Sequence, residues 1–291
     1  MISSRESVAA GGLAEGLERP ACPLCRSTRA RPTDYRREAY AVVRCAECRL
    51  FYLSPRLSEA SMRRHYEAAD YFEGGACGYD SYARQEASLR LTFRKVARAL
   101  DRAGLAGGSL LEVGAGYGFF LDEARDYFVR RDGTELSPPA AARAAASADA
   151  LWRGGIEAVP AGRLYDLVVS FHVIEHVYAP GAFVASLVAH LRPGGHLVLA
   201  TPDMGGAWRH LLGRRWPSFK WPEHVTFFDR ATLGRLMREA GLQELRQVAY
   251  PHAFPLGDLA AKLGLPAPRR FAALPLPIPG TTLALAGRRP S

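Results

Sequence analysis

The sequence predicts an α/β protein built on a parallel sheet, preceded by a small cysteine-rich module. A short apolar run, Leu110–Val113, ends in glycines at alternate positions, Gly114, Gly116 and Gly118. A strand that turns through glycines into a helix typically opens a nucleotide-binding α/β domain. A second run, Tyr165–Phe171, is apolar on both faces, as a central parallel strand should be. Two C-x2-C pairs near the N-terminus predict the separate module.

Length and composition limit the classes of protein that this chain can belong to. Its 291 residues can form one α/β domain and a smaller module. The net charge is +9, but only three of the 38 basic residues are lysines and no run of five basic residues occurs. Scattered arginines do not predict a nucleic-acid-binding face. Residues 1–18 have no apolar core of a signal peptide, and prolines interrupt the longest uncharged run, Phe271–Gly287. We expect a cytoplasmic protein without a membrane span, with residues 1–18 as a disordered lead-in.

The cysteine pairs predict a structural zinc site. Cys22 and Cys25 form the first C-x2-C, and Cys45 and Cys48 form the second after a spacer of 19 residues. Four thiolates at this spacing are typical of a tetrahedral Zn²⁺ site, and a site filled by four sulfurs leaves no position for substrate. We expect a zinc ribbon over residues 19–56, with strands at 39–43 and 50–53.

A linker is expected between the ribbon and the main domain. Over residues 57–84, Ser58 should cap a short helix, and a loop rich in glycine and aromatic residues should follow. Tyr71 and Tyr79 in that loop are candidate substrate contacts. Packing of the ribbon onto the main domain would explain the same residues.

The glycine turn is better suited to a cationic nucleoside than to a phosphate. The dinucleotide fingerprint needs glycine at position 119, where this chain has Phe119, and Glu112 would repel a pyrophosphate. The pattern Glu112-x-Gly114-x-Gly116-x-Gly118 resembles the first motif of class I S-adenosylmethionine-dependent methyltransferases. The resemblance implies that residues 85–291 form a seven-stranded Rossmann-like sheet with an antiparallel last strand, and that S-adenosylmethionine is the cofactor.

Further acidic residues fit a nucleoside ligand. Glu135 ends the second predicted strand, where a carboxylate can accept both ribose hydroxyls. A helix-entry acid favoured by the helix dipole is the alternative. In the third stretch, Gly155 takes the position where the family usually has an acid. Ile156 could still pack on the adenine, and Glu157 could read its amino group. The resemblance implies these cofactor-binding residues: Glu112, Gly114, Ala115, Gly116, Gly118, Phe119, Glu135, Leu136, Ile156, Glu157, Phe171 and His172.

The segment after Tyr165–Phe171 resembles the fourth motif of the family, an apolar strand ending in H-V-L-E-H. His172-x-x-Glu175-His176 also matches the inverted metallopeptidase pattern, which requires a helix and a third ligand. Here the motif follows a strand, and Pro180 comes four residues after His176. A related methyltransferase group holds magnesium with E-x-x-E-H, but His172 replaces the first glutamate. We expect His172 near the cofactor and His176 as a base facing the acceptor; a purely structural imidazole is the alternative for each.

An aromatic insertion, residues 203–228, contains three of the four tryptophans. An aromatic loop at the carboxyl edge of an open sheet can cover a substrate. Its segment from Pro222 to Phe228 is similar to the P-E-H-x-x-F-F of many small-molecule methyltransferases. His224 is a second candidate base, and Trp216, Lys220 and Trp221 are candidate substrate contacts. Residues 251–280, rich in proline, are expected to form a lid or a dimer surface.

Three functions remain open at this level. The leading one is methyl transfer to a small molecule in natural-product, sugar or cell-surface glycan biosynthesis. The alternatives are an RNA base methyltransferase that uses the zinc module to bind RNA, and a non-catalytic zinc-ribbon binding protein. The sequence does not identify the acceptor or distinguish O-, N- and C-methylation.

Overall fold

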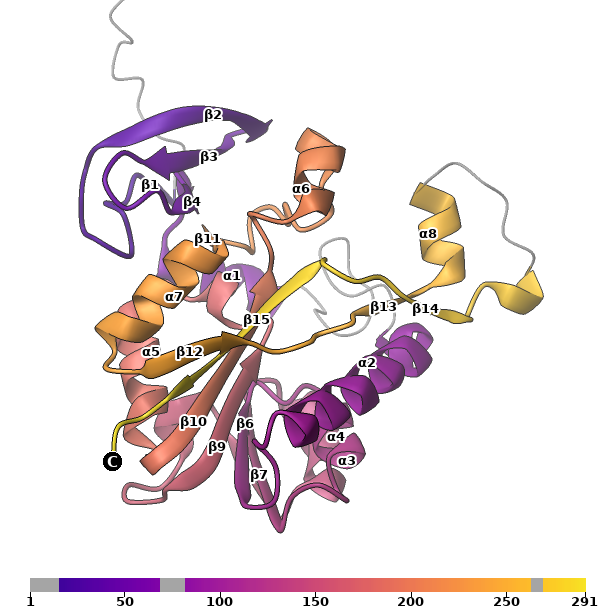
Figure 1. Ribbon diagram of the computed structural model, residues 1–291. Coiled ribbons are helices and arrows are strands. Elements are labelled where there is room, and N and C mark those ends of the chain that lie inside the picture. Colours follow the sequence, from indigo (N-terminus) through magenta and orange to yellow (C-terminus); the bar gives the residue numbers. More distant parts are fainter. Residues whose placement is uncertain (1–15, 69–81, 263–268) are drawn as a thin grey trace, which may run out of the picture.

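The computed structural model describes residues 16–68, 82–262 and 269–291. It shows a large α/β domain with a small β-rich module at its upper edge (Figure 1). The predicted substrate contacts Tyr71 and Tyr79 lie outside the described residues. Within the described parts, no helix is long and apolar enough to cross a membrane.

The large domain is built on a seven-stranded mixed sheet in the order β12-β15-β10-β9-β6-β7-β8. Neighbouring strands from β10 to β8 are parallel, and β15 is antiparallel to both β10 and β12. The predicted sheet with its antiparallel last strand is confirmed. The strands are β6 (Ser109–Val113), β7 (Arg130–Glu135), β8 (Ala150–Arg153), β9 (Tyr165–Phe171), β10 (Leu191–Pro202), β12 (Gln243–Gln247) and β15 (Thr282–Arg288).

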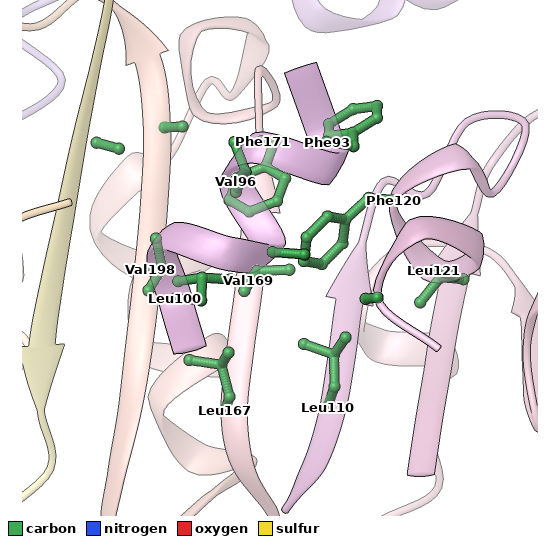
Figure 2. Close-up of a cluster of buried hydrophobic side chains, with 14 of the residues drawn as sticks. Phe93, Val96, Leu100, Leu110, Phe120, Leu121, Leu167, Val169, Phe171 and Val198 are labelled. Atoms are coloured by element: carbon green, nitrogen blue, oxygen red, sulfur yellow. The ribbon is translucent and has the colours of Figure 1, made fainter. Parts of the chain in front are cut away.

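Helices cover both faces of this sheet because its strands are apolar on both sides. On one face, α2 (Tyr82–Arg102), α3 (Phe119–Glu123) and α4 (Pro138–Ala144) pack over a core that includes Leu110 (Figure 2). On the other, α5 (Pro180–Ala189) and α7 (Arg230–Glu239) cover a core that includes Leu111. Adjacent residues enter opposite cores, as the two-residue period of a strand requires. The arrangement leaves the carboxyl ends of β6, β7 and β9 at one edge.

Strand β10 begins before its continuous apolar part. It already includes Leu191, which pairs with Tyr165. The register shifts between Leu191 and His196. At Gly195 a Cβ would lie 3.0 Å from the carbonyl oxygen of Tyr165, so only glycine lets the irregular segment lie against β9. Close backbone approach explains Gly195, whereas the left-handed φ of 80° explains Gly194.

The N-terminal module contains a four-stranded antiparallel sheet in the order β11-β4-β3-β2. Its strands are β2 (Ala30–Arg37), β3 (Tyr40–Cys45), β4 (Phe51–Leu53) and β11 (Thr226–Phe227). Sequence analysis predicted only the two middle strands. The polar strand β2 has no clear alternation, and β11 comes from the aromatic insertion of the large domain. The insertion therefore joins the two parts through backbone pairing.

Short elements flank this module. The predicted lead-in falls mostly outside the described residues, but Leu17–Glu18 forms β1 and pairs with β5 (Arg56–Leu57). The helix expected after Ser58 is α1 (Glu59–Ala68), and the Ser58 hydroxyl accepts from the amide of Ser61 at 3.2 Å.

The described parts of the segment 251–280, residues 251–262 and 269–280, pack on the same chain. Strands β13 (Ala253–Pro255) and β14 (Pro275–Pro277) form a hairpin that contains α8 (Leu256–Lys262) in its connection. The amide of Ala253 donates to the Thr92 hydroxyl of α2 at 2.8 Å. The hairpin therefore lies along α2, beside the domain (Figure 1).

Candidate functional site

The glycine turn after β6 adopts a conformation that other residues would strain. Gly114, Gly116 and Gly118 have φ values of 85°, 55° and 76°. A Cβ on Gly114 would lie 2.5 Å from a methyl of Val173, and one on Gly118 would lie 2.9 Å from the Cα of Ala144. The turn thus combines left-handed backbone with close approach to two neighbouring segments, which glycine alone accommodates. Gly114 and Gly116 remain partly exposed, so a ligand at this edge of the sheet can approach their backbone.

Glu135 is fixed directly beside this turn. Its Oε2 accepts from the amide of Gly116 and its Oε1 from the amide of Ser137, both at 2.8 Å. Ser137 also caps α4 by accepting from the amide of Ala140. Burial raises the pKa of Glu135 above its usual value, although the backbone donors act in the opposite direction. The carboxylate is therefore held in one orientation at the end of β7.

Glu112 is buried, and only one of its two carboxyl oxygens has a hydrogen-bond partner among the described residues. Its side chain is 2% exposed, it accepts a backbone hydrogen bond from Leu121, and its Oε2 has no partner among the described residues. Burial, and then the charge of Glu135, raise the pKa of Glu112 well above the usual value. A buried polar atom without a partner is costly and rare. A cationic ligand at the glycine turn would satisfy it, so the residues present fit S-adenosylmethionine.

The segment predicted to bracket the adenine has Gly155 at the position of the usual acid, but it places the Glu157 carboxylate beside that glycine. The Glu157 carboxylate folds back and accepts from the amide of Gly155 at 2.8 Å. A Cβ on Gly155 would lie 2.5 Å from the Glu157 Oε2, so the Glu157 carboxylate fills the space of a residue-155 side chain. Ile156 is buried next to it. An acid is thus present at this position in space, although not in the sequence.

The remaining predicted cofactor contacts lie in different environments. Ala115 and Phe119 are buried under the turn, whereas Leu136 is 73% exposed. Phe171 packs in the core, 5.0 Å from the ring of Phe120 and 5.4 Å from that of Tyr250 between centroids (Figure 2). The structure therefore gives Phe171 a clear packing role.

His172, immediately after β9, has an unusual backbone and a buried nitrogen. Its φ of 56° is rare for a residue other than glycine. Its Nδ1 lies 3.3 Å from Oε1 of Glu175, and its Nε2 is buried with no partner among the described residues. The rings of Tyr250 and His252 lie 5.5 and 5.4 Å from its ring centroid. No motif in the sequence indicated Tyr250 or His252, which come from segments distant in the chain.

Glu175 links several segments from a fully buried position. It is 1% exposed, its Oε2 accepts from the Thr201 hydroxyl at 2.9 Å, and its backbone oxygen accepts from the amide of Val225 at 2.8 Å. Burial alone would raise its pKa, but the hydrogen bond from His172 and the nearby imidazoles lower the pKa to about 2. The hydrogen bonds from His172 and Thr201 therefore favour the ionised form of Glu175.

The two candidate bases, His176 and His224, lie next to each other and next to Glu175. The rings of His176 and His224 lie 4.7 Å apart at 88°. His224 donates from Nδ1 to the carbonyl of Ser218 at 2.8 Å, and His176 bonds to the carbonyl of Glu223. Desolvation lowers the pKa of His176 to about 4 and that of His224 well below its usual value. Both imidazoles are thus neutral at pH 7, and a nitrogen that donates to a carbonyl fixes the lone pair on the other nitrogen.

A metal ion is the alternative occupant of this cluster. Ligand atoms of Glu175, His176 and His224 all lie within 4.8 Å of one another, and such donors suit several divalent metals. The nearby Lys220 ammonium, whose charge lowers the pKa of both imidazoles, opposes a cation there. The motif itself forms a 3₁₀ turn, Ile174–His176, rather than the long helix of a metallopeptidase. A pair of neutral bases fits these observations better.

The four cysteines converge as a metal site requires. The Cys22 and Cys48 sulfurs lie 3.4 Å apart, those of Cys25 and Cys45 lie 3.5 Å apart, and all four are within 4.8 Å of one another. Tetrahedral Zn–S bonds of about 2.3 Å place sulfurs about 3.8 Å apart. The donor set therefore fits Zn²⁺.

The aromatic insertion brings its predicted contacts to the module–domain boundary. Trp216 is 4% exposed and packs in a third apolar cluster with Phe219 and Phe227. Trp221 remains partly exposed and Lys220 is exposed. Of the three, Lys220 and Trp221 offer surface to a substrate.

Comparisons with known proteins agree with this geometry. The methyltransferase domain family matches residues 79–247, more than half of the chain. A Mycolicibacterium smegmatis protein named for S-adenosylmethionine-dependent methyl transfer is 30% identical over 162 residues, 55% of this chain and 61% of its own length. A tRNA U34 carboxymethyltransferase of Pseudoalteromonas translucida is 49% identical over 47 residues, 16% of this chain and 15% of its own. The chain thus spans about three fifths or less of these relatives.

Solved structures show the same fold. A methyltransferase of Thermotoga maritima superposes with a TM-score of 0.52 at 20% identity, covering 72% of this chain and 94% of its own. A Haloferax volcanii methyltransferase, solved in complex with the Trm112 activator, superposes with a TM-score of 0.52 at 21% identity. The match covers 72% of this chain and 95% of that methyltransferase. The chain therefore belongs to the methyltransferase domain family, and its fold is that of the class I S-adenosylmethionine-dependent methyltransferases.

Proposed function

We propose that this protein transfers the methyl group of S-adenosylmethionine to a small-molecule acceptor in natural-product, sugar or cell-surface glycan biosynthesis. The observation that carries the proposal is the buried, half-satisfied Glu112 beside the fixed carboxylate of Glu135. Two acids at a glycine turn favour a ligand that combines a cationic group with ribose hydroxyls.

On the cofactor side, each residue has a distinct role in the proposal. Glu135 accepts the ribose hydroxyls, and the backbone of Gly114 to Gly118 lies against the ligand. Glu112 supplies negative charge for the cationic part, and Glu157 with Ile156 borders the adenine. When bound, S-adenosylmethionine supplies an electrophilic methyl group on a sulfonium.

On the acceptor side, His176 is the proposed general base. It is neutral at pH 7 and keeps part of its surface exposed, whereas His224 is buried and orients it. A positioned base contributes roughly 10²–10⁴-fold to rate. The ammonium of Lys220 would favour an acceptor that becomes negatively charged as it loses its proton. Orientation of the acceptor and exclusion of water supply the remaining rate enhancement.

The zinc proposal concerns the structural role of the module. We infer that Cys22, Cys25, Cys45 and Cys48 hold one Zn²⁺, which fixes β3 and the turn before β4. Since β11 of the insertion pairs with β4, the metal would also support the position of His224.

An RNA substrate is the second candidate. The 47-residue similarity to a tRNA-modifying enzyme and the net charge of +9 favour it. Binding of RNA that weakens steeply with salt would support this candidate over a small molecule.

Replacing Glu135 by alanine should weaken S-adenosylmethionine binding at least tenfold. Charge-assisted hydrogen bonds contribute about 1.5–3 kcal/mol, which corresponds to roughly 10- to 100-fold in affinity. Equilibrium dialysis with labelled S-adenosylmethionine measures this, with Glu239→Ala on the exposed face of α7 as the control. Affinities within twofold of each other would refute the ribose assignment.

His176 and His224 should both be neutral at pH 7. Burial lowers both pKa values below the usual 6.5, to about 4 for His176, so His176 in the folded protein should be half protonated only near pH 4. NMR titration of histidine-labelled protein measures this, with the two signals identified by their loss in His176→Ala and His224→Ala. Titration of either imidazole above pH 6 would contradict the proposed base pair.

Removing zinc should destabilise the module and then the insertion. We expect about one zinc per chain, and chelation or Cys48→Ser should lower the melting temperature because a closed four-sulfur site contributes folding energy. Metal analysis and thermal unfolding measure this, with Cys77→Ser, outside both C-x2-C pairs, as the control. Zinc content and melting temperature that are unchanged in Cys48→Ser would rule out the site.

A further inference from the structure

A hollow of about 270 Å³ opens where strand β2 of the module faces the aromatic insertion. The side chains that matter for its chemistry are Arg36, Arg37, Arg214 and Arg215, together with Tyr35 and Trp221. Arg36 and Arg37 belong to strand β2 of the module, and Arg214 and Arg215 belong to the aromatic insertion. The hollow is separate from the glycine turn and from the cysteine cluster.

The positive charge of this hollow is poorly compensated. Arg214 lies 3.9 Å from Asp34 and Arg37 lies 3.8 Å from Glu38, distances too long for hydrogen bonds between exposed side chains. Arg36 and Arg215 form no ion pair with any described residue. Four arginines therefore line one hollow with few acidic partners, which favours an anion with several oxygens, because arginine binds such groups through paired N–H donors.

The floor of the hollow is a rigid aromatic cluster. Trp216 and Phe219 are 4% and 7% exposed. The ring of Phe219 lies 4.7 Å from that of Tyr35 and stacks on Trp221 at 5.7 Å. Tyr35 and Trp221 keep partly exposed faces. Such faces can stack a planar group, so the hollow combines an anion site with a surface for an aromatic ring.

We propose that this hollow binds the nucleoside diphosphate part of a phosphorylated acceptor. The inference rests on the proposed methyl transfer, because it assigns the chemical class of the acceptor. Lys220 directly precedes Trp221, and its charge acts on His176 and His224. Ring contacts also connect the hollow to the histidines. The ring centroid of Phe219 lies 5.4 Å from that of Phe227, which lies 6.3 Å from that of His224. A ligand anchored here could extend its remaining part toward the histidines.

A small ligand fits better than an RNA chain. The volume of about 270 Å³ is close to the lower end of small-molecule sites, which begin at about 300 Å³. Nucleic-acid binding uses a basic stripe that follows many phosphates. The four arginines here surround one concavity instead.

The test uses the full-length, zinc-loaded protein with uridine diphosphate and inorganic pyrophosphate as probes in calorimetric titrations. The proposal predicts that uridine diphosphate binds, and that Arg36→Ala with Arg215→Ala weakens it at least tenfold. Arg31→Ala, an exposed residue on the same strand outside the hollow, is the matched control and should change affinity less than twofold. Loss of S-adenosylmethionine binding in the double variant would indicate misfolding, in which case Trp221→Ala provides the second test of uridine diphosphate affinity.

The outcomes separate the two proposals. Wild-type protein that binds S-adenosylmethionine but not uridine diphosphate overturns this inference and leaves methyl transfer standing; failure to bind S-adenosylmethionine overturns methyl transfer itself. Pyrophosphate that binds as tightly as uridine diphosphate would refute the stacked nucleoside. Binding of a single-stranded RNA oligomer 100-fold tighter than uridine diphosphate, lost in the double variant, would overturn the small-ligand assignment in favour of RNA.

Discussion

The burial of three carboxylates at one edge of the sheet is the constraint on which the site depends. Glu112, Glu135 and Glu175 are 2%, 7% and 1% exposed. A buried charge is tolerated only when it is paired or hydrogen-bonded. Backbone amides satisfy Glu135, and His172 with Thr201 satisfies Glu175. Glu112 alone keeps a buried oxygen without a described partner, which is why the cofactor is expected there.

Backbone hydrogen bonds join the N-terminal module to the loop after β9, which carries Glu175. The amide of Val225 donates to the backbone oxygen of Glu175, and the carbonyl of Val225 accepts from the amide of Leu53 in β4. Because His224 precedes Val225, its position depends on both the loop after β9 and the module. The module therefore helps to hold His224, the neighbour of the proposed base His176, in place.

Local patterns could be predicted from the sequence, and long-range contacts could not. The glycine turn, Glu135 and the cysteine pairs depend on residues close in sequence, so spacing was sufficient to find them. Strand β11 pairs with a segment about 175 residues away, and nothing in Thr226–Phe227 indicates that partner. The Glu157 carboxylate lies beside Gly155 only because its side chain folds back onto the Gly155 amide. The arginine hollow likewise forms only when two distant segments meet.

The most direct test of this account is the number of protons exchanged when S-adenosylmethionine binds, measured by calorimetry near pH 6 in buffers of different ionisation enthalpy. The pKa of Glu112 is raised in the free protein, and a cationic ligand should lower it. The account predicts proton release by the wild-type protein that disappears in Glu112→Gln. The same proton exchange in both proteins would contradict the claim that this buried carboxylate is completed by the cofactor.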